Sequence, residues 1–203
     1  MSGQLRPAID AIARGEIVIL TGDRLRGGDI DFCAAASLIT TEHITFMATH
    51  GRGLICLTMS SERALRLGIG LINPSTERQT GRPFGNSIEA KEGVTTGISA
   101  ADRAHTIRTA VAPGATSSDL VSPGHVFPLI TRSGGVDERM SAAEGSVRLC
   151  NLAGVGDCAV ICSIMRDDGE MARLEDVRPL IEKFGIQVCD ISSLSTQAAK
   201  GGE

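Results

Sequence analysis

Short apolar runs rich in β-branched residues alternate with segments of helical spacing, and this alternation restricts the possible folds more than any other feature. The runs that we predict to be strands are Ile17–Leu20, Leu54–Thr58, Val126–Ile130, Ala159–Met165 and Ile186–Ile191. Apolar residues recur every three or four positions in several of the intervening segments, which is typical of helices. Strands and helices that alternate in this way form layered domains. We therefore expect an α/β fold of the layered α+β sandwich type.

Helix boundaries are indicated by capping residues and glycines. The predicted helices are Ile9–Ala13, Phe32–Ile39, Thr41–Thr49, Ser61–Leu67, one that begins near Ser99, Ser141–Leu152 and Glu175–Phe184. The Ser99 start rests on the capping-box spacing between Ser99 and Asp102. The segment Asn73–Pro83 is polar and rich in turn-forming residues, so we expect a mobile loop there.

Length and charge limit the class of protein. With 203 residues we expect one domain, 1–203, with a core over about residues 8–194. A net charge of -4, no Trp or Tyr and five Phe argue against a nucleic-acid surface and favour a small soluble ligand. No apolar run has the length of a signal peptide or a membrane span, so we expect a cytoplasmic protein without a membrane partner.

The six cysteines lie mostly inside apolar runs. They stand at positions 33, 56, 150, 158, 162 and 189, and no Cys-x-x-Cys pair occurs among them. That spacing argues against a zinc knuckle or a thioredoxin-type redox site. We expect reduced, buried thiols with a structural role.

Three long motifs follow one another along the chain. They read HGRGLIC at residues 50–56, EGVTTGISAADR at residues 92–103 and SPGHVFPL at residues 122–129. Their order and spacing resemble the signatures of 3,4-dihydroxy-2-butanone 4-phosphate synthase, over about residues 8–194. The resemblance implies that family's fold and a homodimer with active sites at the subunit interface. It also implies a magnesium-dependent lyase that releases formate from ribulose 5-phosphate in riboflavin biosynthesis.

Two segments depart from the family where the resemblance places magnesium ligands. Residues 24–29 read RLRGGD, and Leu25 stands where the family has a metal-binding Glu. Residues 139–143 read RMSAA, with Ala142 in place of a metal-binding His and Ala143 in place of a Thr. Neither Leu nor Ala can bind a metal ion. We therefore expect that the family's magnesium is lost and that no cofactor replaces it.

Several other residues match substrate-facing positions of the family, whereas Arg26 is an addition beside the place of the family's acidic metal loop. The predicted catalytic residues are His125 and Asp29, and the predicted substrate-binding residues are Arg24, Arg26, Cys56, Thr95, Thr96, Arg139 and Ser163. Ser163 stands where the family has a catalytically important Glu, and a hydroxyl has no useful acidity near neutral pH. Without the resemblance, Asp29 would be interpreted as a helix N-cap, His125 as a structural residue and Arg26 as a solvated side chain. With it, the three arginines could replace the ion electrostatically and hold an anionic ligand or enolate.

Three functions agree with these observations. We expect first a diverged enzyme, lyase-like or isomerase-like, that binds a sugar phosphate or related keto compound. Its reaction would be a metal-independent enolisation, isomerisation or elimination. The first alternative is a catalytically silent binding or regulatory homologue. The second is a working synthase whose metal ligands come from elsewhere in the chain.

Overall fold

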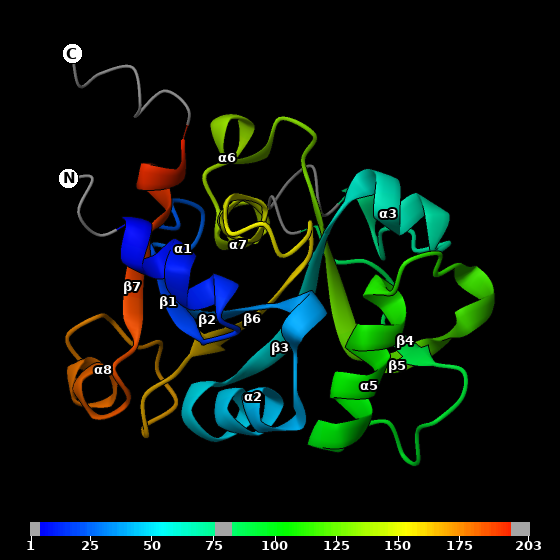
Figure 1. The fold of residues 1–203 in the computed structure, drawn as a ribbon, viewed down its shortest axis with the longest axis horizontal. Helices are drawn as coiled ribbons and strands as arrows, with labels where there is room; N and C mark the ends of the chain where they lie inside the picture. The colour runs from blue at the N-terminus through cyan, green and yellow to red at the C-terminus, as the bar shows by residue number, and fades with distance from the viewer. Residues whose placement is uncertain (1–4, 76–82, 196–203) are drawn as a thin grey trace.

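The computed structural model describes residues 5–75 and 83–195, and within them a seven-stranded sheet runs through the centre (Figure 1). The strands are β1 Val18–Thr21, β2 Asp31–Ala35, β3 Arg52–Ser60, β4 Ile88–Ala90, β5 Leu120–Thr131, β6 Ala159–Ile164 and β7 Gln187–Asp190. They are ordered β4-β5-β3-β6-β2-β1-β7. Strands β3 and β5 pair in parallel, as do β1 and β7, and the other pairs are antiparallel. The predicted α/β fold is confirmed.

Helices cover both faces of this sheet. They are α1 Leu5–Ala13, α2 Thr41–Phe46, α3 Ser61–Arg66, α5 Ala100–Val111, α6 Gly135–Glu138, α7 Ala142–Leu152 and α8 Arg178–Phe184. Short helical turns complete the chain: η1 Ala36–Leu38, η2 Met47–Gly51, η3 Ser117–Asp119 and η4 Ile191–Leu194. Helices α1 and α7 pack over one face, whereas α2, α5 and α8 lie against the other (Figure 1).

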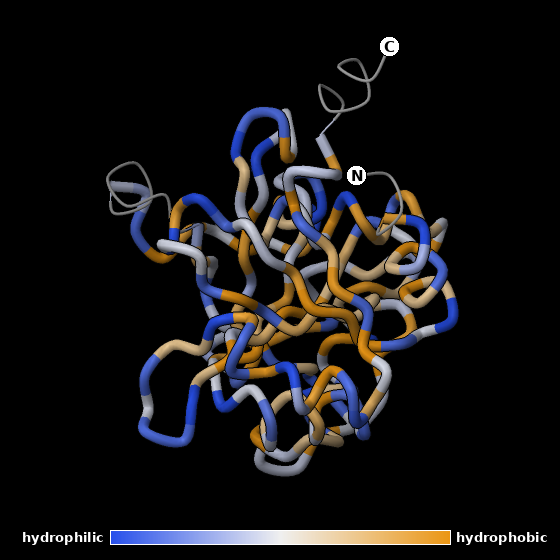
Figure 2. The backbone as a smooth tube through the Cα atoms, turned by 90° about the vertical axis from the view of Figure 1, so that its left-hand side faces the viewer, coloured by the Kyte–Doolittle hydropathy of each residue, from blue (hydrophilic) through white to orange (hydrophobic). Residues whose placement is uncertain are grey.

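The two covered faces explain why most strands are apolar on both sides. In β6, Val160, Cys162 and Ile164 belong to the core under α2 and α5, whereas Ala159 and Ile161 belong to the core under α7. Side chains alternate along a strand, so Ser163 points to the α7 side. Figure 2 shows the same arrangement along the chain, with hydrophobic segments inside and hydrophilic loops outside.

The predicted helix over Phe32–Ile39 is wrong. Residues 31–35 form strand β2, which lies between β1 and β6, and a single 3-10 turn follows it. The cause is burial on both faces, because a strand with no exposed side has no polar alternation to distinguish it from a buried helix. By contrast, the helix start at Ser99 is confirmed, since the Ser99 side chain accepts a hydrogen bond from the Asp102 amide at 3.0 Å.

The remaining sequence expectations have mixed outcomes. All six cysteines are buried, as predicted, and burial raises the pKa of Cys150 to about 12 and that of Cys189 to about 11. Most of the predicted loop Asn73–Pro83 lies outside the described residues. In the described part of the chain, no helix combines the length and the apolar character needed to cross a bilayer.

Candidate active site

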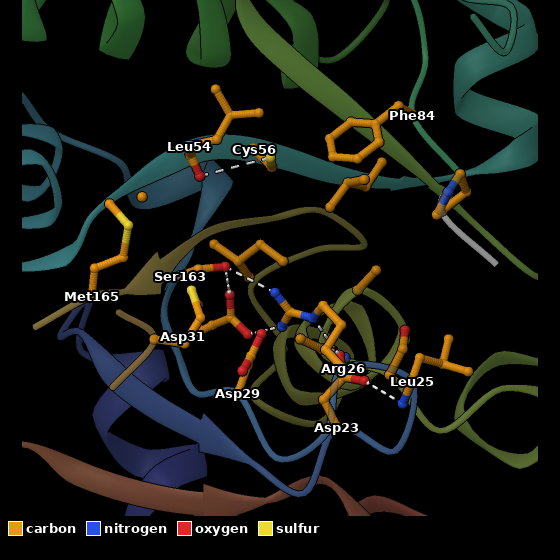
Figure 3. A pocket seen from close by; sticks show the side chains of 18 of the residues that line it. Asp23, Leu25, Arg26, Asp29, Asp31, Leu54, Cys56, Phe84, Ser163 and Met165 are labelled. Atoms are coloured by element: carbon orange, nitrogen blue, oxygen red, sulfur yellow. Dashed lines mark hydrogen bonds and ion pairs between the residues drawn. The ribbon is translucent and has the colours of Figure 1, made fainter. Parts of the chain in front are cut away.

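A cavity of about 380 Å³ lies on the α7 side of the sheet (Figure 3). Four neighbouring strands contribute side chains to it, namely Asp31, Cys56, Leu129, Ile161 and Ser163. Its walls come from the loop after β1 and from the first residues of α7, including Ala142 and Ala143. The cavity therefore gathers segments that are far apart in the sequence.

Arg26 is held inside this cavity by three groups. Its Nε donates to Asp23 at 3.0 Å, its Nη1 donates to the Ser163 hydroxyl at 2.8 Å, and its Nη2 pairs with the Asp31 carboxylate. The Ser163 hydroxyl in turn donates to Asp31 at 2.8 Å. The Arg26 side chain is 26% exposed, whereas those of Asp23 and Asp31 are 3% and 1% exposed. The interpretation of Arg26 as a solvated side chain is wrong.

The electrostatics of this network keep Arg26 charged. Burial acts to lower the pKa of Arg26, but the carboxylates of Asp31 and Asp23 outweigh it and raise that pKa above its ordinary value. Burial raises the pKa of Asp31, and the Arg26 guanidinium opposes that rise. Buried charges are stable only when they are paired and hydrogen-bonded, so these side chains depend on one another.

Asp23 joins the loop after β1 to the start of α7. Its carboxylate accepts hydrogen bonds from the backbone amides of Leu25 at 2.8 Å and Ala142 at 2.9 Å. Ser141 is the N-cap residue of α7 but makes no capping hydrogen bond, so Asp23 satisfies this free amide instead. As a result, Leu25 and Ala142 both lie on the cavity wall.

Asp29 and Cys56 also line the cavity. The Asp29 carboxylate accepts a hydrogen bond from Arg173 at 2.8 Å, and its side chain is 16% exposed. A strand rather than a helix follows Asp29, so its interpretation as a helix N-cap is wrong. Burial raises the pKa of Cys56 far above its ordinary value, which keeps this thiol protonated and unreactive near neutral pH.

His125 lies in a second group, on β5. Its Nδ1 is 2.7 Å from the Glu89 carboxylate, and the His125 side chain is 43% exposed. Glu89 packs closely on Gly97, where an added Cβ would lie 1.6 Å from the Glu89 Oε1 atom. This contact links His125 to the loop of Thr95 and Thr96. None of these residues is among those that line the 380 Å³ cavity.

The loop before α5 is held by Asp102. Thr95 donates to that carboxylate from its amide at 3.1 Å and from its hydroxyl at 2.8 Å, and the Gly97 amide donates at 3.0 Å. The hydrogen bonds from Thr95 are the main cause that lowers the pKa of Asp102. The Thr95 and Gly97 amides are therefore already engaged here, while Thr96, also predicted to bind substrate, stays exposed.

The two other predicted arginines lie outside the cavity lining. Arg139 is buried, and its Nε donates to Glu144 at 2.8 Å, so that it braces the first turn of α7. Arg24 is exposed and lines a shallow depression beside the cavity, together with Met140 and Asp190. A substrate contact by Arg24 or Arg139 remains a prediction.

The residues present do not fit a magnesium ion. Magnesium needs oxygen ligands in near-octahedral geometry, and the carboxylates in this cavity are those of Asp23, Asp29 and Asp31. Each of them already accepts hydrogen bonds from an arginine, and the Arg26 guanidinium lies against two of them. Over residues 5–75 and 83–195, no group of three or more His, Cys, Asp or Glu side chains is arranged to hold a metal.

Two residues of the network, Asp23 and Asp31, were not predicted. Asp31 lies inside the apolar run IDFCAAA, where a carboxylate needs a buried partner. The need of Asp31 for a partner could therefore be inferred from the sequence, and Arg26 is the nearest cationic residue along the chain. Asp23 gave no such signal, because aspartates are common in loops.

Comparisons with known proteins agree with the motifs and with the fold. The sequence profile of 3,4-dihydroxy-2-butanone 4-phosphate synthase matches residues 6–197. The synthase of that name from Pseudomonas aeruginosa is 44% identical over 186 residues, which cover 92% of this chain and 51% of the relative. The riboflavin biosynthesis protein RibBA of Aquifex aeolicus is 46% identical over 189 residues, with 92% and 47% covered. The chain thus spans about half the length of these curated relatives.

A solved structure agrees over nearly its full length. A 3,4-dihydroxy-2-butanone 4-phosphate synthase in complex with two magnesium ions has a TM-score of 0.89 and 34% identity, over 97% of this chain and 96% of that one. The fold implied by the motifs is therefore confirmed. In sequence and in fold, this chain belongs to the 3,4-dihydroxy-2-butanone 4-phosphate synthase family.

Proposed function

We propose that this chain acts on a ketose phosphate of the ribulose 5-phosphate kind, bound in the 380 Å³ cavity. The names of the relatives favour a synthase of 3,4-dihydroxy-2-butanone 4-phosphate in riboflavin biosynthesis. The motif resemblance implies ribulose 5-phosphate as the substrate and formate as the second product. The observation that carries the proposal is the meeting of Asp29 and Cys56 in one cavity of the matching fold. Its volume lies within the range of about 300–1,000 Å³ that is typical of small-molecule sites.

Asp29 is the candidate general base. Its carboxylate faces the cavity and is held by Arg173, which leaves one oxygen without a hydrogen bond from the described residues. This oxygen would take the proton from the carbon beside the ketone. The C–H electron pair would form a C=C bond, and the carbonyl oxygen would gain the negative charge. The same first step serves a synthase and an isomerase.

We also propose that two copies of the chain share each site. Asp29 lies in the cavity, whereas His125 is exposed on β5 with Nδ1 at Glu89 and no hydrogen bond from Nε2 to any residue that the structure describes. The exposed apolar side chains Leu54 and Val121, 49% and 46% exposed, lie near the cavity and near His125 respectively. Such side chains favour an interface.

A complementation experiment tests the shared site. Asp29→Asn and His125→Gln would each be inactive as homodimers, but their mixture would contain heterodimers with one intact site. Random exchange in a twofold dimer then restores about one quarter of the wild-type activity. Equal inactivity of the mixture, after light scattering has shown that subunits exchange, would contradict the shared site.

A second candidate function is a metal-independent enolisation, isomerisation or elimination. The observation that favours it is the donor set of the cavity, where Leu25 and Ala142 offer no ligand and Arg26 lies against the carboxylates. In this candidate no carbon–carbon bond is broken and no formate is released. The ligand would be a ketose phosphate or a related α-hydroxyketone.

One incubation separates these functions. The protein is mixed with ribulose 5-phosphate in deuterated buffer containing either magnesium chloride or EDTA, and NMR follows formate and the hydrogen at C3. Formate supports the synthase, and exchange at C3 without formate supports the second candidate. Binding without either would contradict both and indicate a silent homologue. Asp29→Asn should abolish turnover, whereas the surface change Asp10→Asn should preserve it.

A further inference from the structure

We propose that Arg26 is a built-in cation that takes the place of a divalent metal, so that ligand oxygens bind to its guanidinium. This inference rests on the proposed ketose-phosphate function and adds the group that recognises the substrate oxygens.

Arg26 is fixed in place before any ligand arrives. Three groups on three different segments hold it: Asp23 in the loop after β1, Asp31 on β2 and Ser163 on β6. In Figure 3 its guanidinium lies between these partners at the cavity wall. A donor that is oriented in advance needs no reorganisation when negative charge develops on a ligand.

The guanidinium keeps donors for a ligand. Arg has five N–H groups, and the contacts of Arg26 with described residues engage one each on Nε, Nη1 and Nη2. One N–H on Nη1 and one on Nη2 remain. Each of these donors can bind an oxygen of an α-hydroxyketone or its enediolate, and the charge of the guanidinium strengthens the bond.

The charges of the cavity favour a guanidinium over an added ion. Asp23 and Asp31 pair with Arg26, and Asp29 pairs with Arg173. Arg52 lies at the rim of the cavity and forms an ion pair with Asp167. A divalent ion placed between Asp23 and Asp31 would meet a positive charge at contact distance, where repulsion is strong. Asp31 acts here as a positioning residue, because it fixes the guanidinium and is itself 1% exposed.

Electron paramagnetic resonance with manganese tests the metal half of the inference without any substrate. We expect the signal of free Mn²⁺ to stay unchanged when wild-type protein is added. The triple variant Leu25→Glu/Arg26→Asn/Ala142→His should remove part of that signal, because it supplies a carboxylate and an imidazole and takes away the guanidinium. Stoichiometric uptake of Mn²⁺ by wild-type protein, abolished by Asp31→Asn, would overturn the inference.

Calorimetry with ribulose 5-phosphate tests the ligand half. Wild-type protein should bind it equally well in EDTA and in magnesium chloride. Arg26→Met should weaken binding by about 10- to 100-fold, the usual loss when a charged hydrogen-bond partner is removed. Arg26→Lys should weaken it less, because the charge remains without the paired donors. The matched surface change Arg14→Met should leave binding unchanged.

Two results separate failure of the inference from failure of the proposed function. If Arg26→Met unfolds the protein, the double variant Arg26→Met/Asp31→Asn removes the cation together with one of its two carboxylate partners and serves in its place. Binding that needs magnesium, or that is unaffected by loss of Arg26, contradicts the inference while the function stands. No binding of ribulose 5-phosphate by wild-type protein contradicts the function, and the manganese experiment still decides whether Arg26 excludes the metal.

Discussion

Replacing Arg26 with Met should destabilise the protein far more than replacing a surface arginine. The change removes hydrogen bonds to Asp23, Asp31 and Ser163 and leaves two carboxylates, 3% and 1% exposed, without their cation. Breaking a fully buried ion pair costs about 3–5 kcal/mol. Because the Arg26 side chain is 26% exposed, water relieves part of this cost, and we expect about 3 kcal/mol.

Urea unfolding followed by circular dichroism measures this loss, and calorimetry gives the change in melting temperature. For a chain of this size, about 3 kcal/mol corresponds to a fall of roughly 6–12 °C. Asp31→Asn should lower the stability by less, and the double variant should be more stable than Arg26→Met alone, since only the Asp23 carboxylate is then left without its cation. Arg14→Met, which breaks a surface pair with Glu16, should have no measurable effect.

A loss of unfolding free energy below about 1 kcal/mol for Arg26→Met would contradict a buried ion-pair network, because that value is typical of a surface ion pair. The network would also be contradicted if the unfolding free energies lost in Arg26→Met and in Asp31→Asn simply added up in the double variant. Additive effects are expected only for sites that do not touch one another.

Three further predictions concern other parts of the molecule. Hydrogen bonds lower the pKa of Asp102 below its ordinary 3.8, so its hold on the loop before α5 should be present above pH 3.8 and lost as the pH falls through the folded-state pKa. The protection of that loop's amides, relative to their intrinsic exchange rates, should fall there, and unchanged protection would contradict the assignment. Gly97→Ala places a Cβ against the Glu89 carboxylate at a φ of +80° and should break its contact with His125, visible as a shift of the imidazole nitrogen resonances. Cys56 should resist iodoacetamide at neutral pH, because burial raises its pKa, and rapid alkylation of native protein would contradict this.

The sequence was sufficient for the fold class and for several helix ends. Apolar runs such as Ala159–Met165 and the cap at Ser99 depend on local chemistry, and the structure has both a strand and a helix start there. Strand β2 was not predicted correctly, because burial on both faces hides the alternation.

The site was harder to predict than the fold. Arg26 lies in a glycine-rich loop, which locally favours an exposed side chain, and one of its partners, Ser163, is 137 positions away. The pairing exists because Asp31 and Ser163 are direct neighbours in the antiparallel pair of β2 and β6. Register of this kind is a property of the folded sheet, so no local pattern could reveal it.

The network around Arg26 also limits which single substitutions this protein can tolerate in evolution. Glu at position 25 alone would add a carboxylate beside Asp23 while Arg26 still fills the space. Loss of Arg26 alone would strand two buried acids, and Glu in place of Ser163 would crowd Asp31 with a second negative charge. Each single step toward a metal site therefore lowers stability before it adds a usable ligand. The effects of these substitutions depend on one another, so a chain with this arrangement would gain a metal site only through several coordinated substitutions.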